Sequence, residues 1–291
     1  MIPVSRPRRS ALYMPASNPR AVEKARTLEC DVVILDLEDA VLPEMKDQAR
    51  ADAMAALAAG GFGRREVVIR INGLETPWGK ADLAAAAAVG PDAVLVPKVR
   101  CEADIEAYDL GLAAAPAHTA LWAMIETPQA VLGVEPIAAT SGQTRLAAFV
   151  MGINDLAKEM GARQTRERAP FHAALSLSVM AARAHGLAVL DGVHNEIDDL
   201  DLLEAVCRQG LEFGFDGKSL IHPSHLAICN RAFAPPADEV AWARAVIAAF
   251  AAPENAGKGA LRVDGRLAER LHLGQAEQLV QVATAIETVR S

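Results

Sequence analysis

Short, almost continuous apolar runs alternate along the chain with longer stretches in which apolar residues recur every three or four positions. Runs of this kind are typical of parallel strands that are buried on both faces and joined by helices. We therefore predict eight strands separated by helices. They cover residues 11–15, 31–39, 66–72, 93–99, 120–127, 146–155, 187–193 and 215–223.

Eight strand–helix units in 291 residues predict an α/β fold of the (β/α)₈ type, the TIM barrel. A doubly wound open sheet is the alternative, but no G-x-G-x-x-G motif follows the first predicted strand. After residue 233 the pattern changes to a long amphipathic helix, a hairpin-like stretch with glycines and a final helix. We expect a catalytic barrel over residues 1–233 and a C-terminal helical extension over residues 234–291. The extension is either a lid over the mouth of a barrel, its own or a neighbouring subunit's, or a surface helical pair.

Composition narrows the class of protein. Lysine and arginine total 29 against 37 aspartates and glutamates, a formal net charge of −8, which argues against a nucleic-acid partner. The four cysteines have no metal-binding spacing, as expected for reduced packing residues. The basic N-terminus is not followed by an apolar segment, and the alanine-rich runs are broken well before the roughly 18 residues of a membrane span. We expect a soluble cytoplasmic protein.

Polar and charged residues gather where the predicted strands end. Barrel enzymes build their active sites at the carboxyl ends of the strands, so this ring of residues predicts a functional site there. In chain order, the ring contains Asp36, Glu38, Asp39, Arg70, Asn72, Lys98, Glu126, Thr127, Asn154, Asp155, Asp191, His194, Lys218 and His222.

Glu126 and Asp155 follow the adjacent fifth and sixth predicted strands, with Asn154 and Thr127 as further oxygen donors. Two carboxylates without histidine or cysteine suit a hard divalent cation such as Mg²⁺. The alternative is that one carboxylate caps a helix. Thr127 before Pro128 has the features of an N-cap, which leaves Glu126 free to bind a metal.

Basic residues at two places in the chain each have two possible roles, one in binding an anion and one structural. Arg70 closes an apolar strand, where it either stabilises an anion of the substrate or forms a salt bridge with the acids of the second strand. Around the first strand and its helix, basic side chains either bind phosphate groups or lie on the surface. These are Arg8, Arg9, Arg20 and Lys24.

Seven segments together resemble the signature sequences of the citrate lyase β-subunit/malyl-CoA lyase family, of the HpcH/HpaI aldolase type. In order they are RSALYMPASNPRAVEKA, VVILDLEDAV, VIRING, AVLVPKV, IETPQAV, GINDLAKEMG and GFDGKSLIHPSHL, and the resemblance extends over nearly the whole chain. It implies a Mg²⁺-dependent barrel, with Mn²⁺ as an alternative metal. It also implies a homotrimer or homohexamer that acts on CoA thioesters of hydroxy-dicarboxylic acids.

The resemblance also implies roles for individual residues. The IETP and GIND segments make Glu126 and Asp155 the metal ligands, and VIRIN makes Arg70 the group that binds the substrate carbonyl and the enolate oxygen. The DLEDAV segment makes Glu38 and Asp39 partners of metal-bound waters.

Two further segments concern CoA and proton transfer. By resemblance, Arg9 and Tyr13 in the stretch RSALYMPAS, with Lys24 beyond that stretch, are expected near the CoA. Lyases of the family carry D-G-x-M-I-D in the C-terminal lid, and its last aspartate is an acid/base delivered from a neighbouring subunit. This chain has DGRLAERLHL instead, with Glu269 at that position. The extra methylene of Glu269 displaces the carboxylate by about an ångström, which can be costly for catalysis.

The same departure bears on the reaction. The stretch VDGRLAERLHL resembles the branch of the family that hydrolyses (3S)-malyl-CoA to malate and CoA. We therefore predict hydrolysis of the thioester, ahead of a retro-aldol C–C lyase on the same site. A non-catalytic, carrier-dependent subunit of the citrate lyase β type is the second alternative.

Overall fold

Eight parallel strands pair in chain order, and the barrel closes because β1 pairs with β8. The structure, a computed structural model, describes residues 6–290. The closed barrel confirms the predicted (β/α)₈ fold and shows that the open-sheet alternative is wrong. The strands are β1 (Ser10–Pro15), β2 (Val32–Asp36), β3 (Glu66–Arg70), β4 (Ala93–Val96), β5 (Ala120–Ile125), β6 (Leu146–Met151), β7 (Ala188–Asp191) and β8 (Gly217–Leu220).

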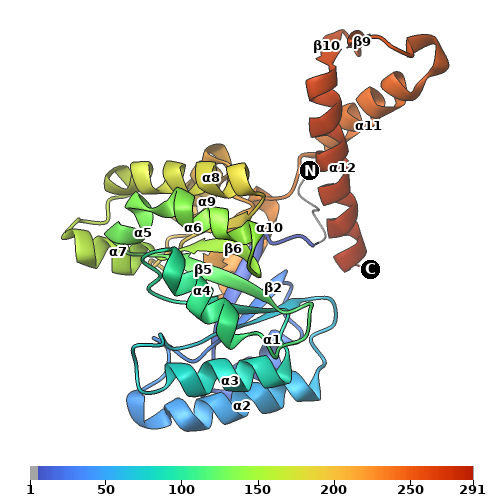
Figure 1. Ribbon diagram of the computed structural model, residues 1–291. Helices are drawn as coiled ribbons and strands as arrows, with labels where there is room; N and C mark the ends of the chain where they lie inside the picture. Colours follow the sequence, from blue (N-terminus) through green and yellow to red (C-terminus); the bar gives the residue numbers. More distant parts are fainter. Residues whose placement is uncertain (1–5, 291) are drawn as a thin grey trace. The chain divides into compact units, whose positions relative to one another are not determined.

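Helices follow the strands and cover the outside of the barrel (Figure 1). Helices α2 and α3, for example, lie side by side in Figure 1, outside β2 and β3. The helices of the barrel are α1 (Pro19–Ala25), α2 (Lys46–Ala59), α3 (Gly79–Val89), α4 (Glu102–Gly111), α5 (Pro128–Leu132), α6 (Val134–Ala139), α7 (Ile153–Met160), α8 (His172–His185), α9 (Leu200–Phe213) and α10 (Leu226–Ala232).

Successive strand residues face opposite sides, which explains why the strands read as continuous apolar runs. In β2, Val32 and Ile34 belong to the core inside the barrel, whereas Val33 and Leu35 belong to the core between strands and helices. Trp122 of β5 is fully buried and fills part of the interior. The predicted second strand was too long, because β2 ends at Asp36 and the other two acids of DLED lie in the following loop.

Arginine–carboxylate pairs close the amino end of the barrel. The guanidinium of Arg9 donates two hydrogen bonds to Asp31, of 2.8 and 2.7 Å, and that of Arg8 donates two to Glu66, of 2.6 and 2.8 Å. A side chain at Gly217 would lie 1.9 Å from the carbonyl oxygen of Arg8, so only glycine allows β8 to approach the start of β1.

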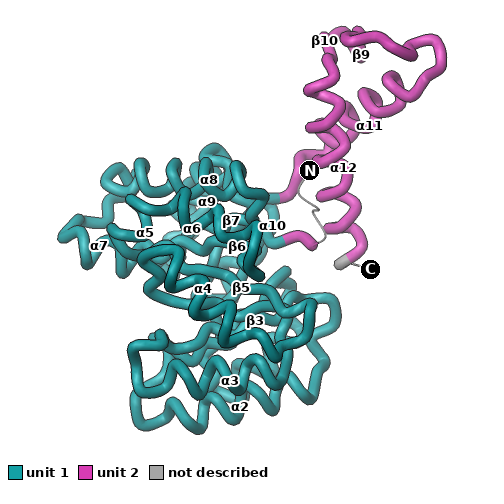
Figure 2. The backbone as a smooth tube through the Cα atoms, in the orientation of Figure 1, with its two compact units in different colours: residues 1, 8–233 teal, residues 2–7, 234–291 magenta. Residues whose placement is uncertain are grey.

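The chain divides into two compact units (Figure 2). The barrel is formed by residues 8–233. The second unit contains residues 234–290 together with residues 6 and 7. Within residues 6–290, no helix combines the length and the apolar character that a membrane span requires.

The second unit is a pair of helices and a hairpin around a small apolar core. The helices are α11 (Ala237–Ala251) and α12 (Arg270–Arg290), and the hairpin consists of β9 (Ala260–Val263) and β10 (Arg266–Glu269). The predicted hairpin-like stretch is confirmed. Its two-residue turn, Asp264-Gly265, has φ values of 47° and 81°, which match the type I′ turn that Asp-Gly favours.

Candidate active site

The carboxyl ends of β1, β2, β3, β5, β6 and β8, with the start of the loop after β7, surround a cavity of about 270 Å³. Six residues of the predicted ring line it, because neighbouring parallel strands end at the same rim. The polar groups that line the cavity are Tyr13, Asp36, Asp39, Arg70, Glu126, Asn154, Asp155 and Ser219.

Arg70 is the buried cation of this cavity, and Asp36 fixes its position. The Nε and Nη2 atoms of Arg70 each donate to Asp36 at 2.7 Å, so the planar guanidinium is held by a two-point contact. Its Nη1 atom lies 2.9 Å from Glu38 Oε2 and 3.4 Å from Asp39 Oδ2. The salt bridge to the acids of the second strand, which was the alternative role for Arg70, is therefore present. Nη1 also lies beside Asp39, which lines the cavity.

Asp36 also organises the loop that carries Glu38 and Asp39. Its two carboxylate oxygens accept from the backbone N–H groups of Glu38 (2.9 Å) and Ala40 (3.1 Å). The ammonium group of Lys46 donates to the Leu37 carbonyl oxygen at 2.8 Å. The buried carboxylate of Asp36 thus fixes the position of both the Arg70 guanidinium and the loop that carries Glu38 and Asp39.

Tyr13 and Met124 form the less polar wall behind Arg70. The guanidinium carbon of Arg70 lies 4.6 Å from the centroid of the Tyr13 ring, a cation–π contact, and Nη1 lies 3.7 Å from the sulfur of Met124. Burial raises the pKa of the Tyr13 phenol, so the phenol stays protonated. Tyr13 is therefore an uncharged side chain in contact with Arg70.

Glu126 is buried at the end of β5 and does not cap a helix. Thr127 caps α5, with its hydroxyl oxygen accepting from the Ala130 N–H at 3.0 Å, as predicted. Glu126 Oε1 accepts instead from the backbone N–H of Lys98 at 2.7 Å. A side chain at Gly152 would lie 2.4 Å from Cβ of Glu126, so glycine lets the turn before α7 approach this carboxylate.

Asp155 lies on the first turn of α7, beside Glu126, and Lys98 connects the two. The ammonium nitrogen of Lys98 is 2.5 Å from Asp155 Oδ2, 3.7 Å from Glu126 Oε1 and 3.9 Å from Glu38 Oε1. Three carboxylates from three different segments of the chain therefore lie within 4 Å of one ammonium nitrogen.

Burial makes this convergence of carboxylates electrostatically costly even with Arg70 and Lys98 beside them. It raises the pKa of Glu38 to about 8 and that of Glu126 to about 7, against the attraction of Arg70 and Lys98. Repulsion between the neighbouring carboxylates acts in the same direction. A divalent cation would favour the ionised form of both groups.

The oxygen donors of this site match what Mg²⁺ requires. Among the described residues, no group of three or more His, Cys, Asp or Glu side chains is arranged to hold a metal alone. Mg²⁺ does not require such a group, because it takes one or two carboxylates and completes its shell with water and substrate oxygens. Glu38 Oε2 is buried and has no hydrogen bond, although Arg70 Nη1 is near, so it can accept one from a metal-bound water. The residues fit the metal.

Three of the residues to which the resemblance assigns a role lie away from this cavity. Arg9 lies at the opposite, amino end of the barrel, where it is 4 % exposed and paired with Asp31. Lys24 is exposed on the last turn of α1. Glu269 belongs to β10 of the second unit, is exposed, and its backbone N–H donates to His272 at 2.9 Å. The prediction that Arg9 contacts CoA has no support from its position, and the roles of Lys24 and Glu269 stay predictions.

Replacing Arg9 by methionine tests which role this arginine has. The change leaves Asp31 buried without its charge partner, so we expect the free energy of unfolding to fall by about 3–5 kcal/mol. Denaturant unfolding measures this loss, and the KM for the CoA substrate should stay within about twofold of the wild-type value. A large rise in KM at unchanged stability would instead restore the CoA-binding role.

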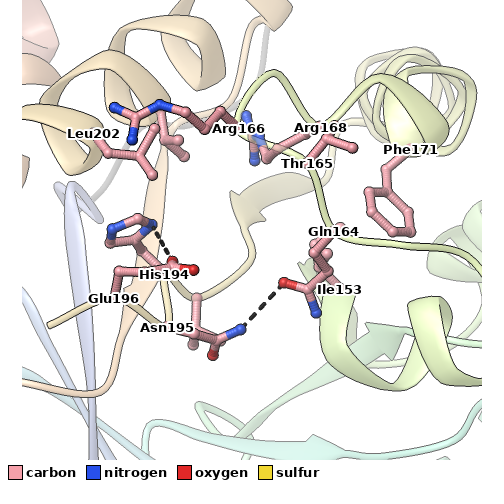
Figure 3. Close-up of a pocket in the computed structure, with 12 residues that line it drawn as sticks. Ile153, Gln164, Thr165, Arg166, Arg168, Phe171, His194, Asn195, Glu196 and Leu202 are labelled. Carbon is pink, nitrogen blue, oxygen red and sulfur yellow. Dashed lines mark hydrogen bonds and ion pairs between the residues drawn. The ribbon is translucent and has the colours of Figure 1, made fainter. Parts of the chain in front are cut away.

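His194 lies in a neighbouring cavity of about 140 Å³, which is shown in Figure 3. Its Nδ1 atom is 3.6 Å from Glu196, and across the cavity Asn195 donates to Gln164 at 3.2 Å. The two cavities share Ile153 and Val193. His194 is therefore near the site but does not line it.

Two residues of the site have contacts that the sequence did not indicate. Lys98 and Asp36 were noted only as polar residues at strand ends, although Lys98 joins the carboxylates and Asp36 holds Arg70. The available signal was their position directly beside strands otherwise made of apolar residues. It could not tell which neighbours they contact.

Comparison with known proteins agrees with this architecture. The chain is 46% identical to a (3S)-malyl-CoA thioesterase of Cereibacter sphaeroides, with 98% of both chains covered. It is 35% identical to an L-malyl-CoA/beta-methylmalyl-CoA lyase of the same species, covering 98% of this chain and 97% of the lyase.

A solved structure is similar as well. CitE from Mycobacterium tuberculosis, in complex with magnesium, acetoacetate and coenzyme A, superposes with a TM-score of 0.75 at 28% identity. The match covers 96% of this chain and 98% of CitE. The family model for HpcH/HpaI aldolase/citrate lyase matches residues 9–223, which contain all eight strands and every residue of the cavity. The chain belongs to the HpcH/HpaI aldolase/citrate lyase family.

Proposed function

We propose that this enzyme hydrolyses (3S)-malyl-CoA to malate and CoA in a Mg²⁺-dependent reaction. The observation that carries the proposal is the convergence of Glu126, Asp155 and Glu38 around the ammonium group of Lys98, with Glu38 also paired to Arg70. The identity to a (3S)-malyl-CoA thioesterase over nearly the full length of both chains supports the choice of substrate.

Glu126 and Asp155 would hold the metal, and Glu38 and Asp39 would accept hydrogen bonds from its waters. When bound, Mg²⁺ supplies a Lewis acid that orients the hydroxyl and carboxylate oxygens of the substrate. Mn²⁺ is a second metal that the same oxygen donors can accept. Magnesium in the CitE complex supports the first choice.

Arg70 is proposed to bind the thioester carbonyl oxygen. Hydrolysis places negative charge on this oxygen when water attacks the carbonyl carbon, and the C–S bond then breaks to release CoA. Because Asp36 already fixes the guanidinium, Nη1 is preorganised as a donor to that charge. Tyr13 and Met124 exclude water from the other side of the guanidinium.

Glu269 is proposed to move the proton in this reaction, from the second unit of its own chain or of a neighbouring subunit. A carboxylate there can take a proton from the attacking water. We further propose that the enzyme is a cytoplasmic homotrimer or homohexamer, and that Tyr13 and Lys24 lie along the CoA.

The second candidate is C–C cleavage on the same site. It is supported by the identity to the L-malyl-CoA/beta-methylmalyl-CoA lyase and by the same cation, which could stabilise an enolate oxygen.

Incubation of malyl-CoA with enzyme and Mg²⁺ separates the two reactions. Hydrolysis yields a free thiol and malate in equal amounts, whereas cleavage yields acetyl-CoA and glyoxylate. Glu269→Gln should slow whichever reaction is found, and an unchanged rate would make Glu269 structural. If neither product pair forms and the protein co-purifies with an acyl carrier, the carrier-dependent subunit becomes the better interpretation.

A further inference from the structure

Lys98 has an unusual backbone conformation for its residue type. It follows β4 and has φ = 53°, in the left-handed region that residues other than glycine and asparagine rarely adopt. This conformation accompanies the hydrogen bond from the Lys98 N–H to Glu126 Oε1. A residue held at an unfavourable φ beside a functional carboxylate suggests a role for its side chain.

The side chain of Lys98 places a positive charge among the carboxylates assigned to the metal. Its ammonium nitrogen is closest to Asp155 Oδ2, at 2.5 Å, and lies within 4 Å of Glu126 and Glu38. Arg70, the other cation of the cavity, is held by Asp36 instead. Lys98 is therefore the cation that contacts both assigned ligands.

A divalent cation and this ammonium group need the same oxygen atoms. Mg²⁺ binds carboxylate oxygens at about 2.0–2.1 Å, so it would lie only a few ångströms from an ammonium nitrogen that contacts the same Asp155 oxygen. Two positive charges at that separation repel strongly in a partly buried site. The side chain of Lys98 is 30% exposed, and its flexible stem allows the charged end to turn to solvent.

We propose that Lys98 is a tethered counter-ion that competes with Mg²⁺ for Asp155 and Glu126, and thereby sets the affinity of the enzyme for its metal. Binding of the metal then requires the ammonium group to leave the carboxylates. This inference rests on the metal assignment in the proposed function. It adds that a residue of the site opposes metal binding.

Titration calorimetry with MgCl₂ on the full-length protein, first treated with EDTA and dialysed, tests the proposal. We expect Lys98→Met to lower the Kd for Mg²⁺ by on the order of tenfold, because removal of one nearby positive charge favours a cation. Lys98→Arg keeps the charge and should bind Mg²⁺ no more tightly than the wild type. Lys80→Met makes the same chemical change on the exposed face of α3 and should leave the Kd unchanged.

Thermal melts in EDTA give a second readout. With Lys98 replaced by methionine, the carboxylates lose their counter-ion, so we expect a lower Tm in EDTA and a larger rise of Tm on adding Mg²⁺ than in the wild type. Equal or weaker Mg²⁺ binding by Lys98→Met would overturn the proposal.

A parallel titration of Glu126→Gln separates this outcome from failure of the metal assignment. If Glu126→Gln binds Mg²⁺ as well as the wild type does, the metal assignment itself fails. If Glu126→Gln loses binding while Lys98→Met is unchanged, only the counter-ion role fails.

Discussion

Replacing Glu126 by glutamine is expected to lower kcat for malyl-CoA by about a thousandfold, with the protein still folded. Glutamine has the same shape and can still accept from the Lys98 N–H, but it does not bring the negative charge that a metal ligand needs. Asp155→Asn should have a similar effect. Steady-state kinetics at several Mg²⁺ concentrations measure the change.

The stability of Glu126→Gln is the informative companion measurement. Burial raises the pKa of Glu126 to about 7, so the fold disfavours the ionised carboxylate, and a neutral glutamine should leave Tm unchanged or higher. A loss of activity with a gain in stability is typical of residues kept for function. Glu159→Gln, on the exposed surface of α7, is the matched control. Near-normal turnover by Glu126→Gln would contradict the assignment of Glu126 as a metal ligand.

Replacing Arg70 by lysine should lower kcat by about a hundredfold or more while positive charge is kept. An ammonium group cannot contact both Asp36 oxygens and also present a donor to the cavity, as the guanidinium does. We also expect the free energy of unfolding to fall by about 1–3 kcal/mol, since a buried Asp36 oxygen loses its partner. Kinetics and denaturant unfolding report the two effects.

Arg65→Lys provides the control for the second effect. Arg65 is half-buried and donates to the carbonyl oxygens of Leu28 (2.7 Å) and Phe62 (3.0 Å), away from the cavity. The Arg65→Lys variant should be less stable than the wild type but should keep its kcat. If Arg70→Lys behaves in the same way, with stability lost and kcat kept, Arg70 is a structural residue and the oxyanion role is wrong.

The barrel and the core of its site could be predicted from sequence because both follow from simple periodicity. Strands buried on both faces read as apolar runs, and adjacent parallel strands bring their terminal residues to one rim. Glu126 and Asp155 end up side by side for that reason alone. Thr127 could be separated from Glu126 because the cap-and-proline pattern is local.

The position of Arg9 and the contacts of Lys98 could not be predicted from the pattern of apolar residues. Arg9 and the loop after β1 are close in sequence, but a six-residue strand separates them by about 20 Å, the height of the barrel. Lys98 has a backbone in the left-handed region and contacts Asp155, and neither feature can be read from the sequence around it. Side-chain pairing at a rim depends on the conformation of each loop, which no local pattern specifies.

The pairing of β1 with β8 has a consequence for the order in which the barrel can be made. Ala11 leaves the ribosome well before its partner Ser219, which is synthesised about two hundred residues later. Throughout that interval one edge of β1 has no partner, and an open apolar edge is a site for aggregation. Arg8 and Arg9, whose partners Glu66 and Asp31 are made early, can hold the start of the barrel in place while the nascent chain waits for its last strand.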